Sequence, residues 1–206
     1  DIEHFTTISE KLDPEALMDW LNNYMELMAN MVIKCGGVVD DYHGDAIKAD
    51  FGVPIARTTA EQIRLDAINA VNCALGMKQE LEKYNQKTRE QGLPNLRMRV
   101  GISTGTVVAG CLGTSERMKY MTIGDTINTA ARIETLDKES FNTGEESSDC
   151  RILVAESTMN YIKGTWQAEP AGSVVLRGKT RPVTVYRVDT CVAGEVNHYV
   201  PGGVIT

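Results

Sequence analysis

The sequence lacks the features that mark several large classes of protein. It has no basic excess, because 21 Lys and Arg residues stand against 28 Asp and Glu residues and give a formal net charge of −7. Recognition of nucleic-acid phosphates over a wide surface needs a basic face, so this charge argues against a general nucleic-acid binder. No apolar run approaches the ~18 residues that a membrane span requires, and no signal peptide is visible. A local anion site remains compatible with this composition.

Paired cysteines are also missing. The five cysteines are an odd number without paired spacing, so neither a disulfide framework nor a zinc site is predicted. A reducing cytoplasm is the expected location. The length of 206 residues fits one domain, residues 1–206, with a core over 1–187 and a polar surface loop at 138–149.

The hydrophobic pattern predicts helices that alternate with hairpins. Asp13-Pro14-Glu15 is a helix start, and the helical spacing that follows ends at Gly36-Gly37. Further elements are expected as a hairpin at 38–51, a helix at 59–91, a strand at 96–102 with its hairpin partner at 106–112, a short strand ending near 121, a helix at 126–135, a strand at 151–154, a short helix from 156, and closing strands at 174–176 and 183–187. This order predicts an α+β fold, with an antiparallel sheet that has helices on one face.

Two acidic positions are candidate metal ligands. Asp45 lies in the predicted hairpin turn, where an Asp often does no more than hydrogen-bond its own backbone. Asp1 leads into a loop just before a helix. Free backbone N–H groups at such a place suit phosphate oxygens, and carboxylates suit hard divalent ions.

Four short motifs in this order resemble class III adenylyl and guanylyl cyclases, and the resemblance covers about residues 1–187. The motifs are Asp1-Ile2-x-x-Phe5-Thr6, Gly44-Asp45-Ala46, Arg99-Val100-Gly101-Ile102, and Gly124-Asp125-Thr126-Ile127-Asn128-x-x-x-Arg132. The resemblance implies a ferredoxin-like α+β fold. It also implies conversion of a nucleoside triphosphate to a 3′,5′-cyclic monophosphate and pyrophosphate, with two Mg²⁺ or Mn²⁺ ions in each active site.

The same resemblance assigns roles to the first two motifs. Asp1 and Asp45 match the paired metal-binding aspartates, and Ile2 contributes a backbone carbonyl. One ion would activate the ribose 3′-hydroxyl, and the other would neutralise the triphosphate and the leaving pyrophosphate. Phe5 and Thr6 match the backbone that holds the outer phosphates.

The later motifs match the residues that act on the ribose and the phosphates. Asn128 matches the residue that orients the ribose, and Arg132 the one that stabilises charge on the α-phosphate. Arg99, Arg177 and Lys179 are candidates for the β- and γ-phosphates, although most basic residues in strands simply extend to solvent.

In the family, the metal-binding acids and the Asn/Arg pair come from opposite subunits of a head-to-tail pair. One chain with both sets therefore implies a homodimer, with the exposed sheet face buried in the dimer cleft. A regulatory domain is expected upstream in the full-length protein, and any membrane attachment would come from such upstream regions.

Two positions match the base-reading residues of the family. Asp41 stands where adenylyl cyclases usually have Lys and guanylyl cyclases Glu, and an ionised carboxylate can only accept hydrogen bonds. Guanine offers N1–H and an amino group as donors, so Asp41 favours GTP. Lys48, expected opposite Asp41 in the hairpin, would keep Asp41 ionised or form an ordinary cross-strand ion pair. Met121, at the second position, does not discriminate.

Three alternatives stay open. The first is an adenylyl cyclase that uses ATP on the same scaffold. The second is a relative of the diguanylate cyclases, against which the absence of a Gly-Gly-Asp/Glu-Glu-Phe turn argues. The third is a non-catalytic nucleotide-binding dimerisation module, against which the presence of both the metal acids and the Asn/Arg pair argues.

Overall fold

The computed structural model describes residues 1–136, 149–176, 178 and 180–191. The helices are α1 (Phe5–Ser9), α2 (Pro14–Lys34), α3 (Ala60–Glu90), α4 (Asp125–Glu134) and α5 (Glu156–Ile162). The strands are β1 (Val38–His43), β2 (Ala46–Asp50), β3 (Met98–Ile102), β4 (Val108–Gly113), β5 (Met118–Ile123), β6 (Cys150–Ala155), β7 (Trp166–Val174) and β8 (Val183–Cys191). Most predicted elements are therefore present. The predicted loop at 138–149 lies outside the described residues except for Asp149.

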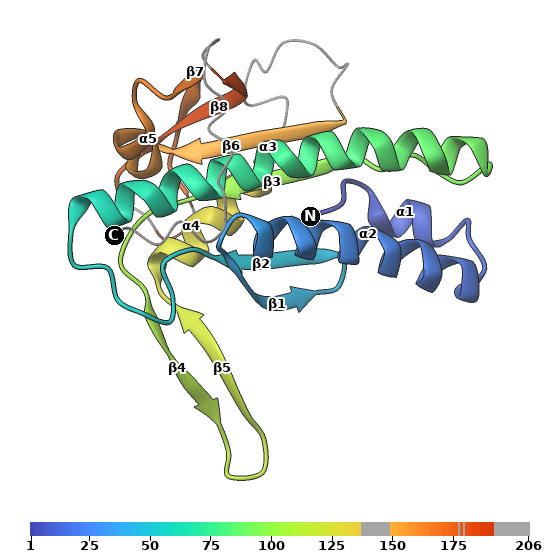
Figure 1. Cartoon of the computed structure of the whole chain (residues 1–206), viewed down its shortest axis with the longest axis horizontal. Helices are drawn as coiled ribbons and strands as arrows, with labels where there is room; N and C mark the ends of the chain where they lie inside the picture. The colour runs from blue at the N-terminus through green and yellow to red at the C-terminus, as the bar shows by residue number, and fades with distance from the viewer. Residues whose placement is uncertain (137–148, 177, 179, 192–206) are drawn as a thin grey trace, which may run out of the picture.

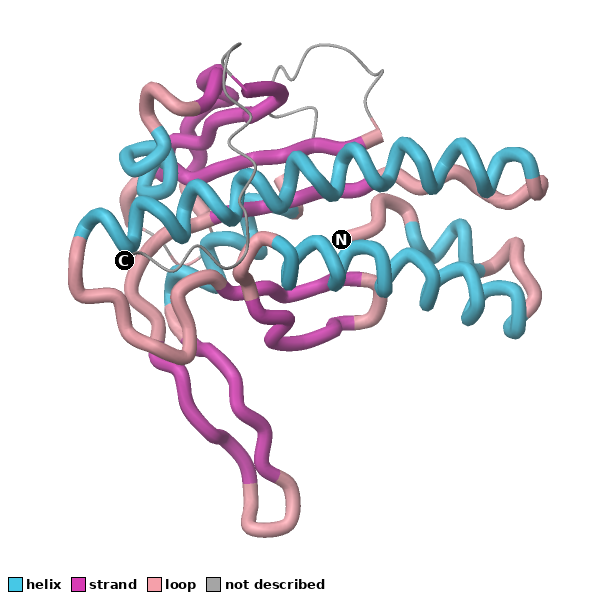
Figure 2. The backbone as a smooth tube through the Cα atoms, viewed as in Figure 1, coloured by secondary structure: helices cyan, strands magenta, loops and turns pink. Residues whose placement is uncertain are grey.

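The two long helices begin as the sequence predicts. The Asp13 carboxylate accepts a hydrogen bond from the Ala16 N–H at 3.1 Å, and Thr59 and Gln62 form a capping box at the start of α3. The helices lie beside one another in the tube view (Figure 2). In the part of the chain that the structure describes, no helix is long and apolar enough to cross a bilayer.

The largest sheet has four strands in the order β3-β6-β8-β7. β3 pairs with β6 in parallel, whereas β8 is antiparallel to both β6 and β7. The α+β fold is thus confirmed, with a mixed sheet in place of a wholly antiparallel one. A strand that returns to the sheet after a long connection can pair in parallel, and local alternation does not encode this choice.

Helices cover both faces of this sheet, not one. Ile152 and Val154 of β6 belong to the main core with α2 and α3, while Leu153 and Ala155 pack in a second cluster with Ile133 of α4. Successive side chains of a strand point to opposite faces, so α3 and α4 lie on opposite sides of β6. The short amphipathic α4 covers part of the face that was predicted to be bare.

Two hairpins stand apart from the four-stranded sheet. β1 pairs with β2 as predicted, but β4 pairs with β5 and not with the strand at 96–102. The prediction of 106–112 as the partner of 96–102 is therefore wrong, because chain proximity does not fix which strand becomes the neighbour. The β4–β5 hairpin projects from the body of the molecule (Figure 1).

The first closing strand was also misplaced. β7 runs over Trp166–Val174, upstream of the predicted 174–176, whereas the predicted 183–187 lies within β8. Pro170 and Gly172 within β7 weaken the strand pattern in the sequence. The register between β7 and β8 is irregular between Gln167 and Ala168 and between Pro170 and Gly172, as expected where a bulge accommodates such residues.

Asn85 joins α3 to the start of β3, and its loss should destabilise the domain. This side chain is 1% exposed; it donates to the Leu96 carbonyl at 2.8 Å and to Asp149 at 3.0 Å, and accepts from the Leu96 N–H at 2.8 Å. Asn85→Ala leaves these groups without their partner, so we expect a loss of roughly 1–3 kcal/mol in the free energy of unfolding. Urea unfolding measures it, with the exposed Asn22→Ala as a control that should change little.

Candidate active site

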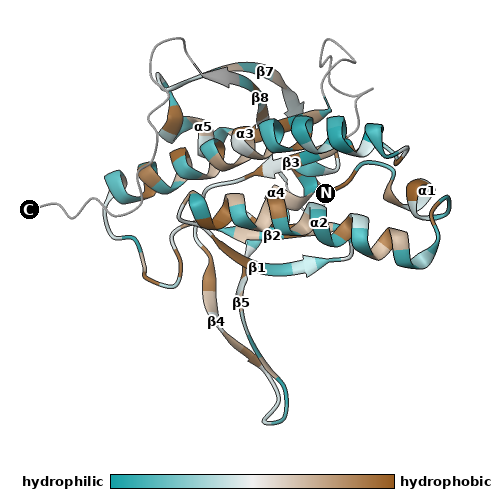
Figure 3. Ribbon diagram, turned by 45° about the vertical axis from the view of Figure 1, so that its right-hand side comes forward, coloured by the Kyte–Doolittle hydropathy of each residue, from teal (hydrophilic) through white to brown (hydrophobic). Residues whose placement is uncertain are grey.

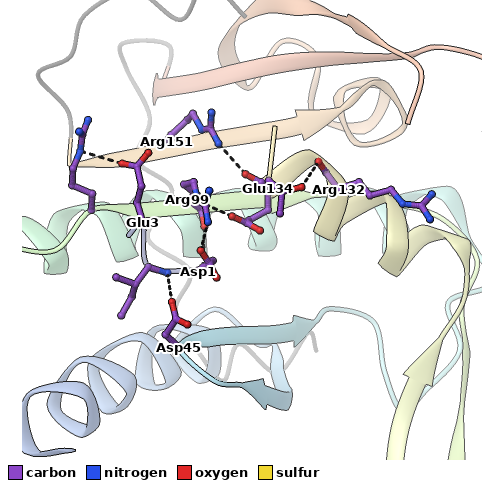
Figure 4. Close-up of polar contacts among 10 residues, drawn as sticks. Asp1, Glu3, Asp45, Arg99, Arg132, Glu134 and Arg151 are labelled. Carbon is purple, nitrogen blue, oxygen red and sulfur yellow. Dashed lines mark hydrogen bonds and ion pairs between the residues drawn. The ribbon is translucent and has the colours of Figure 1, made fainter. Parts of the chain in front are cut away.

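Residues 1–3 lie along the edge of β3 and begin the site. Ile2 forms an antiparallel bridge with Met98, and the Arg99 N–H donates to the Asp1 carbonyl at 2.9 Å. Ile2 is 2% exposed and anchors this segment in the core. The Ile2 N–H in turn donates to Asp45 Oδ2 at 3.2 Å (Figure 4). The structure thus brings Asp45 next to Asp1 and Ile2, although Ile2 and Asp45 are 43 residues apart in the sequence.

Arg99 holds the Asp1 side chain from the other side. Its guanidinium contacts the Asp1 carboxylate through Nη2, and Nε lies 2.9 Å from Glu134 Oε1. Arg151 donates a hydrogen bond to the backbone carbonyl of Glu134 at 2.9 Å, so a second cation also contacts Glu134 (Figure 4). Arg99, predicted to bind phosphate, is therefore engaged with two carboxylates here and orients Asp1.

Gly101 allows α4 to approach the strand that carries Arg99. A Cβ placed at Gly101 would lie 2.2 Å from the Ala130 carbonyl oxygen and 2.6 Å from the Glu134 nitrogen. Both are backbone atoms that cannot move aside, so only glycine permits this packing. This contact explains the glycine of the Arg-Val-Gly-Ile motif, and it fixes the position of α4, which carries Asn128 and Arg132, against β3.

Asn128 and Arg132 lie one helical turn apart on α4 and share a face. Asn128 is exposed, and the Arg132 guanidinium lies beside Gly178, with Nη1 and Nη2 each 3.8 Å from a Cβ placed there. In Figure 4 the Arg132 side chain points away from Asp1 and Asp45. Within one chain, Arg132 is therefore not directed at Asp1 and Asp45. Arg177 and Lys179 lie outside the described residues.

A cavity of about 1030 Å³ opens between β2 and β3. Its lining includes Asp1, Lys48, Arg99 and Asn128, whereas Asp45, Asp41, Met121 and Arg132 are not part of the lining. Cavities of this size accommodate small organic ligands. Part of the predicted site thus faces one hollow, and the base-reading positions lie elsewhere.

Phe5 and Thr6 occupy the first turn of α1, directly after the metal-binding candidates. Phe5 packs against the core and Thr6 is exposed. His4, just before the helix, has a left-handed backbone with φ of 59°. The role of residues 5 and 6 in holding phosphates stays a prediction.

Asp41 pairs with Lys119 and not with Lys48. Asp41 and Lys48 are partners in the β1–β2 register as predicted, but the Lys48 Nζ lies 2.6 Å from Asp40 Oδ2. The register shifts between Val39 and Asp41, and this bulge places Asp40 within reach of Lys48. The prediction that Lys48 aims Asp41 is therefore wrong.

The partner of Asp41 comes from β5. The Lys119 ammonium contacts Asp41 Oδ1, and His43 Nε2 lies 3.4 Å from Asp41 Oδ2. The Lys119 hydrogen bond holds the pKa of Asp41 below its usual value; desolvation opposes this, and the Tyr42 N–H and His43 add to the lowering. Asp41 is thus an acceptor at neutral pH. Lys119 stands two residues before Met121 on β5, on the same face, and this spacing is the one sequence signal that could have found it.

A family profile described as "Adenylate and Guanylate cyclase catalytic domain" matches residues 1–190. The chain belongs to this family.

Individual relatives of both specificities resemble the chain. Adenylate cyclase 1 of Rhizobium meliloti is 34% identical over 188 residues, which are 91% of this chain and 26% of that protein, so the chain spans about a quarter of that relative's length. The crystal structure of the adenylyl cyclase CyaB from P. aeruginosa superposes with a TM-score of 0.80 at 34% identity, over 92% of this chain and 90% of CyaB. The guanylyl cyclase Cya2 gives a TM-score of 0.79 at 30% identity, over 94% and 90%.

Proposed function

We propose that this domain converts a nucleoside triphosphate to its 3′,5′-cyclic monophosphate and pyrophosphate. The observation that carries the proposal is the convergence of Asp1 and Asp45 around the Ile2 backbone, with a matching Asn/Arg pair presented by α4. Little covalent chemistry is required of the protein in phosphoryl transfer, so placement of charge and of the reacting groups accounts for most of the catalysis.

The residues at Asp1, Ile2 and Asp45 fit a pair of divalent ions. This set has only two carboxylates, and within the described residues no group of three or more His, Cys, Asp or Glu side chains could hold a metal without further ligands. Mg²⁺ is usually bound by one or two carboxylates together with substrate phosphates, which is the donor set that two aspartates and a carbonyl leave to be completed. When bound, such ions would activate the 3′-hydroxyl and neutralise the triphosphate.

The remaining residues position the substrate. The backbone N–H groups at Phe5 and Thr6 hold the outer phosphates, Asn128 orients the ribose, and Arg132 stabilises the charge that builds on the α-phosphate. Arg99 places the Asp1 carboxylate, and Arg177 and Lys179 are further candidates for phosphate contact. Arrangement of the 3′-hydroxyl in line with the α-phosphorus lowers the entropic part of the barrier.

We further propose a homodimer in which each site takes Asp1 and Asp45 from one copy and Asn128 and Arg132 from the other. The direction of Arg132 within one chain supports this division (Figure 4). The β4–β5 hairpin offers a surface for the partner, since Val108, Leu112 and Met118 are 65%, 58% and 65% exposed. Figure 3 shows the apolar colouring along β4. Exposed apolar patches of this kind mark contacts between proteins.

GTP is the proposed substrate. Asp41 is held ionised by Lys119 and so accepts hydrogen bonds from the N1–H and amino groups of guanine, whereas adenine N1 requires a donor. ATP is the second candidate, and it is favoured by the likeness to adenylate cyclases of Rhizobium meliloti and P. aeruginosa. Initial rates of cyclic nucleotide formation from GTP and ATP, measured in parallel with Mg²⁺ or Mn²⁺, decide between them.

Reversal of the charge at position 41 should change the purine preference. Asp41→Lys removes the acceptor for guanine and introduces a donor for adenine N1, so we expect the ratio of kcat/KM for GTP over ATP to fall about tenfold or more. Asp19→Lys, an exposed charge reversal on α2, is the matched control. An unchanged ratio in Asp41→Lys would exclude Asp41 from base recognition.

A further inference from the structure

Lys48 joins three strands through one largely buried ammonium group. Its Nζ lies 2.6 Å from Asp40 Oδ2 in β1 and donates to the Thr122 carbonyl in β5 at 2.7 Å. The side chain of Lys48 is 15% exposed and that of Asp40 is 4% exposed. An ammonium group withdrawn from water needs a hydrogen-bond acceptor and a compensating charge; here the Thr122 carbonyl of β5 accepts its hydrogen bond and the Asp40 carboxylate of β1 supplies the charge.

Asp50 makes a second contact to the same residue of β5. The Thr122 hydroxyl donates to Asp50 Oδ2 at 2.6 Å, and Thr122 is 1% exposed. Lys48 and Asp50 are two residues apart in β2, so they lie on the same face of that strand. Burial raises the pKa of Asp50 above its usual value, and the Thr122 hydrogen bond offsets this only in part. The set Asp40, Lys48, Asp50 and Thr122 is called the strand clamp below.

The strand clamp lies next to both base-reading positions along the chain. Asp40 directly precedes Asp41, and Thr122 directly follows Met121. Because Lys48 contacts the Asp40 side chain of β1 and the Thr122 backbone of β5, we expect a change at Lys48 to shift β1 relative to β5. We expect such a shift to alter the separation of Asp41 and Met121.

We propose that Lys48 is a positioning residue for purine selection: through Asp40 and Thr122 it fixes the spacing of Asp41 and Met121, and it does not itself contact the base. This inference rests on the proposed function for the base-reading role of those two positions. Its structural part, that Lys48 holds β5 against the β1–β2 hairpin, is independent of any activity.

Lys48→Met tests the kinetic part of the inference. The methionine keeps most of the side-chain volume and removes the charge and the donors. We expect the ratio of kcat/KM for GTP over ATP to move about fivefold or more toward one, because a misplaced hydrogen-bonding edge discriminates less between purines. General damage to the fold would lower kcat/KM for both purines by the same factor. Lys48→Arg, which keeps a charged donor, should restore most of the ratio.

Lys83→Met is the matched control. Lys83 also forms an ion pair, at 2.7 Å from Glu80, but its side chain is 69% exposed and lies on α3. It should leave the ratio unchanged. A folded Lys48→Met whose ratio stays within about twofold of the original overturns the positioning role.

Hydrogen–deuterium exchange tests the structural part without any activity. In Lys48→Met the amides of β5, residues 118–123, should exchange faster, while those of β6 should not change. Unchanged protection of β5 contradicts the strand clamp. If the original chain forms no cyclic nucleotide, the proposed function fails while the exchange result still decides the clamp.

Thr122→Val covers the case in which Lys48→Met does not fold. It removes the hydroxyl contact to Asp50 and leaves Lys48 in place. A smaller shift of the purine ratio in the same direction, with faster exchange in β5, supports the inference. No change in either measurement overturns it.

Discussion

Asp45→Asn should abolish cyclic nucleotide formation while the domain stays folded. The amide keeps an oxygen that can accept the hydrogen bond from Ile2, which lies 3.2 Å from the carboxylate, but it loses the negative charge that a divalent ion requires. Loss of a residue that only hydrogen-bonds to a metal ligand already lowers metal affinity or activity about 10–100-fold. Loss of a direct ligand should therefore lower activity further. The rate of product formation at saturating Mg²⁺ or Mn²⁺ measures the effect.

Two controls separate this result from unfolding. Asp19→Asn changes an exposed aspartate on α2 and should leave the rate unchanged. The thermal unfolding curve of Asp45→Asn should match that of the original chain within a few degrees. A variant that retains more than about a tenth of the original rate would show that Asp45 is not a metal ligand, since this loss is smaller than removal of a ligand causes.

Two inactive variants should restore activity when they are mixed. Asp45→Asn damages the half-site with the metal acids, and Arg132→Ala damages the half-site on α4, where loss of one transition-state contact costs about 10²–10³-fold. In a mixed dimer, one of the two sites combines the intact Asp45 of the Arg132→Ala chain with the intact Arg132 of the Asp45→Asn chain. The other site combines the two substituted residues and stays inactive. With random pairing, about a quarter of the original activity should return.

The mixing experiment has a direct counter-result. If both half-sites were used within one chain, the mixture would stay as inactive as its components. A double variant, Asp45→Asn with Arg132→Ala, mixed with the original chain serves as the matched control, because its mixed dimers hold one damaged half-site in each of the two sites. Assays after subunit exchange, alongside separate assays of each variant, check the outcome.

Local patterns in the sequence predicted most helices and the first hairpin. Asp13 and the Thr59–Gln62 capping box encode helix starts through contacts within four residues, and both are present as expected. Strand partners are different. The parallel pairing of β3 with β6 and the separate β4–β5 hairpin depend on contacts across the chain, which alternation of apolar residues does not specify.

The candidate site shows the same division. The motifs located Asp1 and Asp45, and the structure brings them together through Ile2. The motifs did not reveal that Arg99 contacts Asp1 or that Lys119 contacts Asp41, because each of these ion pairs joins elements more than 70 residues apart. Lys48 was assigned to the wrong aspartate, since a bulge changes side-chain reach without changing the strand pattern.

The exposed β4–β5 hairpin has a consequence for when the proposed enzyme works. If both sites form only where two copies meet, the rate per chain depends on how often copies encounter one another. Dilution should then lower specific activity, and any attached segment that holds two copies close would raise their effective concentration to about the millimolar range. If the hairpin forms the dimer contact, the rate of cyclic nucleotide synthesis would rise when two chains are held close together and fall when they separate.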